Sequence, residues 1–227
     1  MIPLKDDNPI SSRPIVTYFL IGMCVVVFLM QLGSQSYRTG QLFYSYGLIP
    51  SVLMGNDQLP MDLYAVPAYL TIFSSMFMHG GWIHLIGNMW YMKIFADNIE
   101  DNLGSRNFII FYVLCGIGAA MTQVLMDTHS QVPMVGASGA IGGVLGAYLI
   151  NHPNARVLVL IPYIIITIIK IRALYVLGFW FILQFISSGG GVDYADHIVG
   201  FVSGMILILF FNKKIKRKSK VVKGPWG

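Results

Sequence analysis

Two residues in separate apolar stretches have the side chains of a nucleophile and a general base. Ser138 lies within Gly136-Ala137-Ser138-Gly139 at the start of one stretch, and His197 lies at the start of another. An ionisable residue inside a membrane segment is costly in hydrocarbon, and is therefore a functional candidate. A serine that passes its proton to an imidazole can attack a carbonyl carbon, so the pair predicts covalent catalysis within a bilayer.

His84 and Asn88 form a second polar pair. They are four residues apart, so they share one face of a helix, and in a membrane we expect that face to turn toward the bundle interior. Such side chains can donate hydrogen bonds to the oxyanion that forms during acyl transfer. The alternative is that they hydrogen-bond to neighbouring helices and hold the bundle together.

Ser138 and His197 also have plain structural explanations. A serine among small residues in a membrane helix usually packs against a neighbour, and a lone histidine in a span can be a proton relay. The small residues on the two stretches are Gly139, Gly142, Gly143 and Gly146, and Gly200 and Gly204. Two faces of small residues let helix backbones approach closely, which favours contact between the histidine and the serine.

Two acidic residues lie near His197. Asp196 precedes it directly and is expected to orient the imidazole poorly, because neighbours on a helix point in different directions. Asp193 lies one turn earlier and is within reach. We favour a Ser–His dyad over a triad, because a buried carboxylate costs more than a hydrogen-bonded neutral imidazole.

The composition indicates that membrane helices hold these residues. Of 227 residues, 56% are hydrophobic and 11% are charged, whereas soluble domains carry about 25% charged residues. The net charge of +5 does not favour nucleic acid as a partner, because seven of the fifteen Lys and Arg residues lie between Lys213 and Lys223. A basic cluster after an apolar stretch is typical of the cytoplasmic face, in contact with anionic lipid.

We predict an all-α membrane protein with six transmembrane helices. Several apolar stretches are shorter than the roughly 20 residues of a full span, so hydropathy alone leaves the number open. We assign 157–169, which contains Pro162 and many β-branched residues, to an interfacial loop. We divide the chain into a short tail (1–13), a membrane domain (14–211) and a basic tail (212–227). The membrane domain includes a long first outer loop (33–81). Its six predicted spans are 14–32, 82–97, 107–127, 137–150, 173–187 and 196–211.

The distribution of charge supports six spans with both ends in the cytoplasm. Fourteen of the fifteen Lys and Arg residues then lie inside or at inner span ends, and only Arg38 lies outside, as the positive-inside rule requires. A seventh span at 157–169 would place the basic tail outside. The candidate site residues at the starts of the second, fourth and sixth spans all lie toward the outer face.

The sequence predicts neither a metal nor a cofactor. Cys24 and Cys115 lie in apolar stretches with no zinc-site spacing. His79, His129 and His152 fall in predicted loops or at span ends, where we expect solvated or interfacial positions. The N-terminus has no convincing signal-peptide pattern, and with no obvious transit peptide a bacterial cytoplasmic (inner) membrane is favoured.

Three motifs resemble those of the rhomboid family of intramembrane serine proteases. His84-Leu85-Ile86-Gly87-Asn88 resembles the HxxxN motif of the second rhomboid helix. Gly136-Ala137-Ser138-Gly139 resembles GxSG of the fourth helix, and His197-Ile198-Val199-Gly200 resembles HxxG of the sixth. The resemblance covers about residues 14–211 and keeps the motifs in the family's order.

The resemblance implies a bacterial-type six-helix core and an endopeptidase that cuts single-span membrane proteins in or near their transmembrane segment. Ser138 would be the nucleophile and His197 the general base and then the general acid. The oxyanion hole would comprise His84, Asn88 and the backbone N–H groups of Ser138 and Ala137. The partners would be transmembrane substrates and the lipid bilayer. The fifth helix and the glycine-rich linker 187–195 would form a lateral gate and cap.

Two departures from the family pattern concern His197. Many members have Ala where this chain has Asp196. Some place an aromatic ring one turn after the serine, where this chain has Gly142, so another residue must hold the imidazole here.

Two alternatives to a protease remain. A catalytically inactive, client-binding relative would keep its function in a Ser138→Ala variant. A small transporter would show internal repeats, and the sequence has none that we can find. Both Ser138 and His197 are present, so an active protease is favoured.

Overall fold

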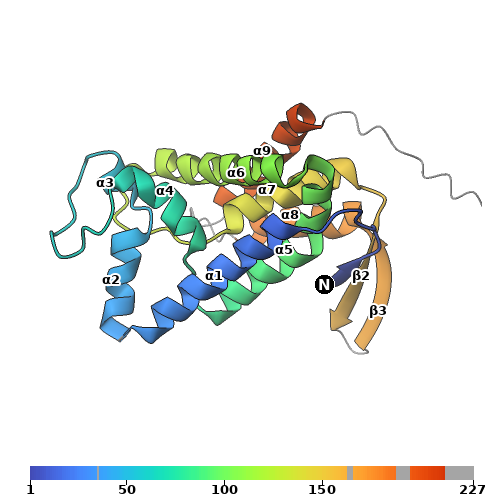
Figure 1. The fold of residues 1–227 in the computed structure, drawn as a ribbon, viewed down its shortest axis with the longest axis horizontal. Coiled ribbons are helices and arrows are strands. Elements are labelled where there is room, and N and C mark those ends of the chain that lie inside the picture. Colours follow the sequence, from blue (N-terminus) through green and yellow to red (C-terminus); the bar gives the residue numbers. More distant parts are fainter. Residues whose placement is uncertain (35, 163–165, 188–194, 213–227) are drawn as a thin grey trace, which may run out of the picture.

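The computed structural model describes residues 1–34, 36–162, 166–187 and 195–212. Within these ranges six long helices form one bundle (Figure 1). They are α1 (Ile15–Gly33), α5 (Trp82–Leu103), α6 (Ser105–Met126), α7 (Ser138–Asn151), α8 (Ala173–Ser187) and α9 (Ala195–Phe211). Each coincides with a predicted span to within two residues at either end, except that α5 continues beyond residue 97 to Leu103. The crossing of the membrane by all six stays a prediction.

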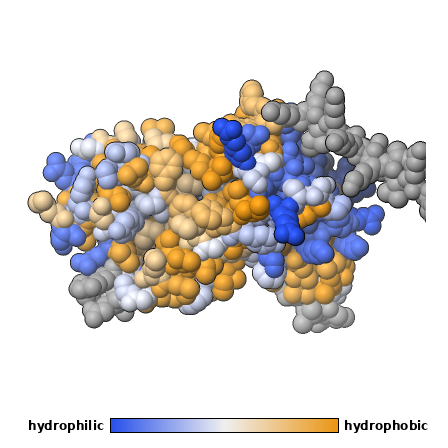
Figure 2. Space-filling model, in the orientation of Figure 1, coloured by the Kyte–Doolittle hydropathy of each residue, from blue (hydrophilic) through white to orange (hydrophobic). Residues whose placement is uncertain are grey.

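The helices differ in how well they are suited to span a bilayer. By length and composition α1 and α6 are each able to cross, whereas α7, α8 and α9 are shorter apolar helices. Apolar side chains cover the middle of the visible face, and polar residues gather toward its two ends (Figure 2). This banded surface is the one expected of a bundle that lies in hydrocarbon with its ends in water.

The central helix of the bundle is α7. Ten consecutive residues, Gly139 to Tyr148, are buried, and the helix packs against α5, α6 and α9. A methyl group added to Gly204 would lie 1.9 Å from the carbonyl oxygen of Gly143, and one added to Gly200 would lie 2.1 Å from that of Gly139. Because no side chain fits there, α7 and α9 meet backbone to backbone.

A buried glutamate joins three helices at one end of the bundle. Glu100, in α5, is 1% exposed. Its carboxylate accepts hydrogen bonds from the backbone N–H groups of Val16 (2.9 Å) and Thr17 (2.7 Å). It also accepts from the hydroxyls of Thr17 (2.8 Å) and Ser105 (2.5 Å). The first N–H groups of a helix have no partner within it, so Glu100 serves as the cap of α1.

A three-stranded antiparallel sheet lies at the same end (Figure 1). Its strands are β1 (Ile2–Asp6), β2 (Arg156–Pro162) and β3 (Ile166–Arg172), in the order β1-β2-β3. Arg156 pairs with Arg172, and Pro3 pairs with Val159. The sheet is fixed to the bundle by Asp6, which accepts hydrogen bonds from the Tyr148 hydroxyl at 2.5 Å and the Asn98 amide at 3.0 Å.

The sheet corrects the assignment of 157–169 to an interfacial loop. Val157 and Val159 are fully buried, and Leu158 and Leu160 between and after them are partly exposed, which is the two-residue alternation of a strand. The β-branched residues that made a helix unfavourable are those that strands prefer. The tail predicted at 1–13 likewise contains a strand, β1.

Short helices occupy the opposite end of the bundle. They are α2 (Ser36–Tyr46), α3 (Pro50–Leu53), η1 (Ala68–Leu70), α4 (Thr71–Ser74) and η2 (Ser75–Phe77), all within the predicted first loop. This region holds the chain that leads into α7, because Leu48 pairs with Met134 and the Gly136 N–H donates to the Ser75 carbonyl at 2.9 Å. The loop therefore supports the start of the central helix.

Candidate active site

The start of α7 places Ser138 inside the bundle. Ser138 is the first residue of the helix, so the unpaired N–H groups of the first turn lie beside its hydroxyl. Gly136 has a φ of 137°, which glycine adopts readily and other residues rarely do. The GxSG sequence therefore forms a turn in which the Ser138 hydroxyl lies next to the unpaired backbone N–H groups at the start of α7.

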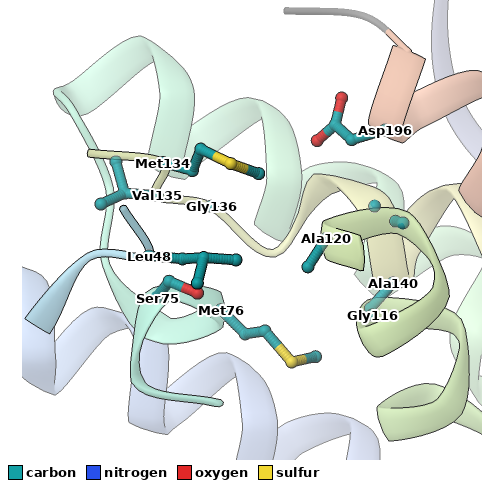
Figure 3. A pocket seen from close by; sticks show the side chains of 12 residues that line it. Leu48, Ser75, Met76, Gly116, Ala120, Met134, Val135, Gly136, Ala140 and Asp196 are labelled. Carbon is teal, nitrogen blue, oxygen red and sulfur yellow. The ribbon is translucent and has the colours of Figure 1, made fainter. Parts of the chain in front are cut away.

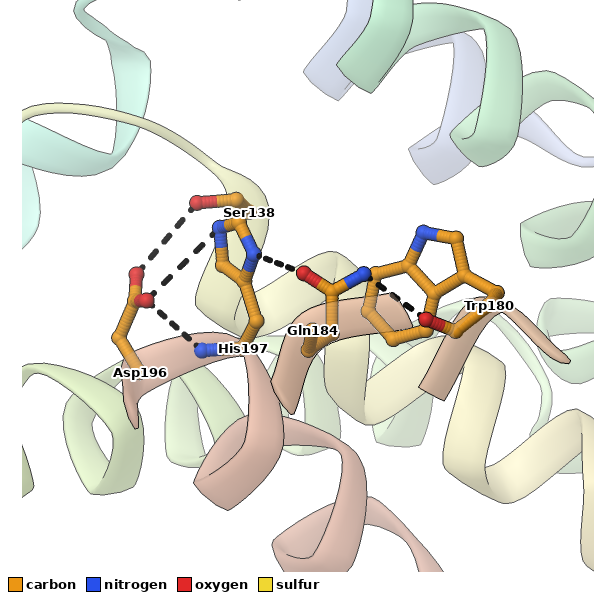
Figure 4. A network of polar contacts seen from close by, with 5 residues as sticks. All are labelled: Ser138, Trp180, Gln184, Asp196 and His197. Carbon is orange, nitrogen blue, oxygen red and sulfur yellow. Dashed lines mark hydrogen bonds and ion pairs between the residues drawn. The ribbon is translucent and has the colours of Figure 1, made fainter. Parts of the chain in front are cut away.

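Ser138 and His197 share a neighbour, the carboxylate of Asp196 (Figure 4). Ser138 Oγ donates to Asp196 Oδ2 at 3.5 Å, and His197 Nε2 lies 3.7 Å from Asp196 Oδ1. The Asp196 carboxylate folds back and accepts from the His197 backbone N–H at 2.7 Å. It therefore lies near the imidazole but not at Nδ1, the nitrogen that an orienting carboxylate binds. Asp193, the other candidate, lies outside the described residues, as does most of the 187–195 linker.

The other side of the His197 ring faces α8. Gln184 Oε1 lies 2.9 Å from His197 Nδ1, and the Gln184 amide nitrogen donates to the Trp180 carbonyl at 2.9 Å. The Trp180 ring is stacked near the imidazole, with centroids 6.2 Å apart and planes at 27°. Sequence reasoning missed both residues. The available signal was a single amide side chain in an otherwise apolar fifth helix.

His84, on α5, lies beside Gly136 and Ser138 at the start of α7. A methyl group at Gly136 would lie 2.9 Å from His84 Nε2 and 3.4 Å from Ser138 Oγ, so both atoms border Gly136. The Gly80 N–H donates to His84 Nδ1 at 3.4 Å. A backbone N–H only donates, so Nδ1 is the acceptor and, in the neutral ring, Nε2 carries the proton. His84 thus presents an N–H beside the serine.

Asn88 lies one turn further along α5. Its amide nitrogen is buried and has no hydrogen-bond acceptor among the residues that the structure describes. A buried donor without an acceptor is rare and needs an explanation. An oxygen that arrives with a substrate would satisfy it.

His79 is not solvated as expected but 1% exposed. Its backbone is held by Gln31 of α1, whose amide donates to the His79 carbonyl and accepts from the His79 N–H, both at 3.2 Å. The ring meets that of His84 edge to face, with centroids 5.1 Å apart. Burial, together with the neighbouring His84 imidazole, lowers the pKa of His79 to about 4, so it is neutral at neutral pH and supports His84 as packing.

The remaining histidines lie elsewhere. His129 is exposed in the loop after α6. His152, at the end of α7, contacts the side-chain amides of Asn8 (3.1 Å) and Asn102 (2.6 Å). Within the described ranges, no three His, Cys, Asp or Glu side chains lie in a group able to hold a metal ion.

A small cavity of about 40 Å³ is bordered by Gly136 and Gly139, the two glycines that flank the Ala137-Ser138 pair in the sequence (Figure 3). Gly136 and Ala140 border it on the α7 side, Met76 and Ser75 on another, and the Asp196 carboxylate points toward it from α9. A cavity of this order has room for a water molecule or a methyl-sized group.

Comparison with known proteins identifies the class of protein that this fold and site define. The family profile described as Rhomboid domain matches residues 67–214. The chain therefore belongs to the rhomboid family and is an integral membrane protein.

Several relatives are named as proteases. Rhomboid-like protease 3 of Toxoplasma gondii is 26% identical over 145 residues, which cover 64% of this chain and 52% of the relative. Putative rhomboid protease YdcA of Bacillus subtilis is 28% identical over 153 residues, 65% of this chain and 69% of the relative. Rhomboid protease GluP of Bacillus subtilis is 27% identical over 197 residues, 86% of this chain and 34% of the relative. The chain thus spans a third to about two thirds of the length of these relatives.

Proposed function

We propose that this protein is an intramembrane serine endopeptidase that cleaves single-span membrane proteins in or near their transmembrane segment. One observation carries the proposal: two histidines from different helices, His84 and His197, each bring Nε2 to the start of α7, where Ser138 lies. The Gly80 N–H at Nδ1 leaves His84 with a proton on Nε2, whereas the Gln184 oxygen at Nδ1 leaves His197 with a lone pair on Nε2. The first suits an oxyanion donor and the second suits a general base.

The proposed reaction assigns one step to each of these groups. Ser138 Oγ attacks the scissile carbonyl carbon while His197 Nε2 takes the hydroxyl proton. The oxyanion accepts hydrogen bonds from His84 Nε2, Asn88 Nδ2 and the free backbone N–H groups at Ser138 and Ala137. His197 then gives its proton to the leaving amine, and water hydrolyses the acyl-enzyme with the same imidazole as base.

The length of α7 supports a site within the bilayer that water can reach. Its 14 residues span about 21 Å at 1.5 Å per residue, less than the roughly 30 Å of a hydrocarbon core. If both termini are cytoplasmic, as the charge distribution favours, and α7 ends at the inner surface, its first residue lies below the outer surface. Ser138 then faces a recess rather than lipid. The bacterial relatives support placing the protein in a bacterial cytoplasmic membrane.

The small cavity supports a preference for small side chains beside the cleaved bond. With about 40 Å³ bordered by Gly136, Ala140 and Asp196, it has room for a methyl group or a water. A transmembrane substrate would therefore be cut after or before a residue such as alanine or glycine.

The test is cleavage of a single-span substrate by protein purified in detergent and reconstituted in liposomes. We expect no product from Ser138→Ala and His197→Ala, and labelling by a fluorophosphonate probe only where Ser138 is present. Two variants serve as matched controls. Ser203→Ala removes the hydroxyl of a different serine, which lies on α9, and His129→Ala removes an exposed imidazole. Equal product from the Ser138→Ala variant and the wild type would reject the mechanism. Folded wild-type protein that neither cleaves nor labels would instead favour an inactive, client-binding relative.

A further inference from the structure

Gln184 is a nearly buried amide in an apolar helix. It is 8% exposed and lies on α8, whose sequence ALYVLGFWFILQFIS has no other amide or charged residue. A polar side chain in such a helix is expensive unless it is hydrogen-bonded. Both ends of this one have partners, His197 Nδ1 and the Trp180 carbonyl (Figure 4).

The two partners fix the direction of the amide. The Trp180 carbonyl oxygen can only accept a hydrogen bond, so the Gln184 nitrogen must face it. The Gln184 oxygen then faces His197 and can only accept, so Nδ1 of the imidazole must carry a proton. In the neutral ring Nε2 is left with the lone pair. That nitrogen lies on the side of the ring where Asp196 and Ser138 are found.

The packing at Gly142 explains why the support comes from α8. A methyl group at Gly142 would lie 2.9 Å from the backbone oxygen of His197. An aromatic ring at this position, one turn after the serine, therefore does not fit. The close approach of α7 and α9 removes that possibility, and the indole of Trp180 stacks near the imidazole instead.

We propose that Gln184 is the positioning residue of His197: it selects the Nδ1–H tautomer and holds the ring for proton transfer. The inference rests on the proposed protease function, because an effect on kcat can be measured only if the protein cleaves a substrate. When His197 takes the serine proton, the Nδ1–H···O bond becomes charge-assisted and strengthens. A neutral amide supplies this support without a second buried carboxylate, which would be costly to desolvate.

The test compares Gln184→Leu and Gln184→Glu with the wild type. Leucine keeps the volume and removes the acceptor, whereas glutamate keeps an acceptor oxygen. Asn151→Leu is the matched control, because it removes an amide hydrogen-bonded to Asn212 between α7 and α9. Asn151 is 13 residues from Ser138 along α7, about 20 Å away.

We expect Gln184→Leu to lower kcat and the rate of fluorophosphonate labelling by roughly 10- to 100-fold. This is the effect on a rate expected when a hydrogen bond to a charged group is lost. KM should stay within about threefold, because the residue does not bind substrate ground states. Gln184→Glu keeps the acceptor at Nδ1 but loses the donor to the Trp180 carbonyl, so it should recover part of the lost kcat. Asn151→Leu should cleave like the wild type. If Gln184→Leu fails to fold, Gln184→Met, which keeps the length and lacks the amide, must show the same loss.

A second measurement does not depend on activity. In the ¹⁵N spectrum of histidine-labelled protein, with His197 assigned by its loss in His197→Ala, the wild type should show a protonated Nδ1 and an unprotonated Nε2. Gln184→Leu should shift this pattern toward a mixture of tautomers. Wild-type kcat and an unchanged His197 spectrum in Gln184→Leu would overturn the proposal while leaving the protease intact. An inactive wild type with the expected spectra would reject the protease and keep the hydrogen bond.

Discussion

Asp196 lies on the Nε2 side of the His197 ring, with Oδ1 3.7 Å from Nε2 and Oδ2 3.5 Å from Ser138 Oγ. In a Ser-His-Asp triad the carboxylate binds the opposite nitrogen, Nδ1, and orients the base. That position belongs to Gln184 in this protein. In the proposed mechanism Asp196 is therefore a competing acceptor for the serine proton rather than the third member of a triad.

The first prediction is that Asp196→Ala remains active. The hydrogen bond from Ser138 is at the limit of useful length, so its loss frees the hydroxyl and costs little. We expect kcat/KM within about threefold of the wild type, or higher, whereas loss of a true triad carboxylate costs on the order of 10⁴-fold. Steady-state cleavage of a single-span substrate measures this. A fall of about a hundredfold or more, in a protein that still melts like the wild type, would restore Asp196 to a catalytic role.

The second prediction separates activity from stability at Asn88. Its amide nitrogen is buried with no acceptor among the described residues, which costs the folded state free energy. We expect Asn88→Ala to lower kcat by roughly ten- to a thousandfold, as for loss of one oxyanion donor, without lowering Tm. Asn151→Ala is the control, because it removes an amide that is hydrogen-bonded at an exposed site, where water replaces the bond, and it should change Tm little and leave kcat unchanged. An Asn88→Ala protein that melts early and cleaves normally would assign Asn88 to helix packing instead.

The third prediction concerns the contact of α7 with α9. A β-carbon at Gly204 would lie 1.9 Å from the Gly143 carbonyl oxygen, and backbone cannot move aside as a flexible side chain can. Gly204→Ala should therefore destabilise the fold by about 1–3 kcal/mol or more, as overpacking does. It should also reduce cleavage, because it drives the helix of His197 away from Ser138. Thermal unfolding and cleavage are measured on the same preparation.

Gly178→Ala is the matched control for this substitution. Gly178 is in α8 and has nothing within 4 Å of an added β-carbon. Alanine is favoured over glycine in a helix by about 0.5–1 kcal/mol, so this variant should melt no earlier than the wild type. Equal Tm for the two alanine variants would contradict the close approach of the helices.

The sequence located the helices when hydropathy was combined with the distribution of charge, because hydropathy alone left the number of spans open. Long apolar stretches placed the six helices, and the membrane-class composition fits the family to which the chain belongs. Strand β2 was missed because Leu158 and Leu160 are apolar although they lie on the more exposed face. A strand with two apolar faces shows no alternation and resembles an interfacial segment.

The site was harder to complete than to locate. Ser138, His84 and His197 belong to recognisable motifs, but Gln184 is a single amide with no periodic pattern, and its role depends on a contact with a different helix. His79 does lie in a loop, as predicted, but it is buried rather than solvated or interfacial, because the sequence does not show that Gln31 of α1 binds its backbone. Local sequence determines which helix a residue is on, whereas side-chain partners depend on the relative positions of helices.

The last prediction tests the cap of α1. Glu100→Ala leaves the N–H groups of Val16 and Thr17 without their acceptor in a buried position, and each such loss costs about 1–3 kcal/mol. Asp101→Ala is the control, because Asp101 accepts similar bonds from Ser11 and Ser12 at an exposed site, where water replaces them. We expect a clear fall in Tm for Glu100→Ala and a small one for Asp101→Ala in scanning calorimetry. Below its Tm the Glu100→Ala protein should label normally with a fluorophosphonate, since the cap lies at the opposite end of the bundle from Ser138. A Tm equal to that of the wild type would show that the hydrogen bonds from Glu100 of α5 do not stabilise the start of α1.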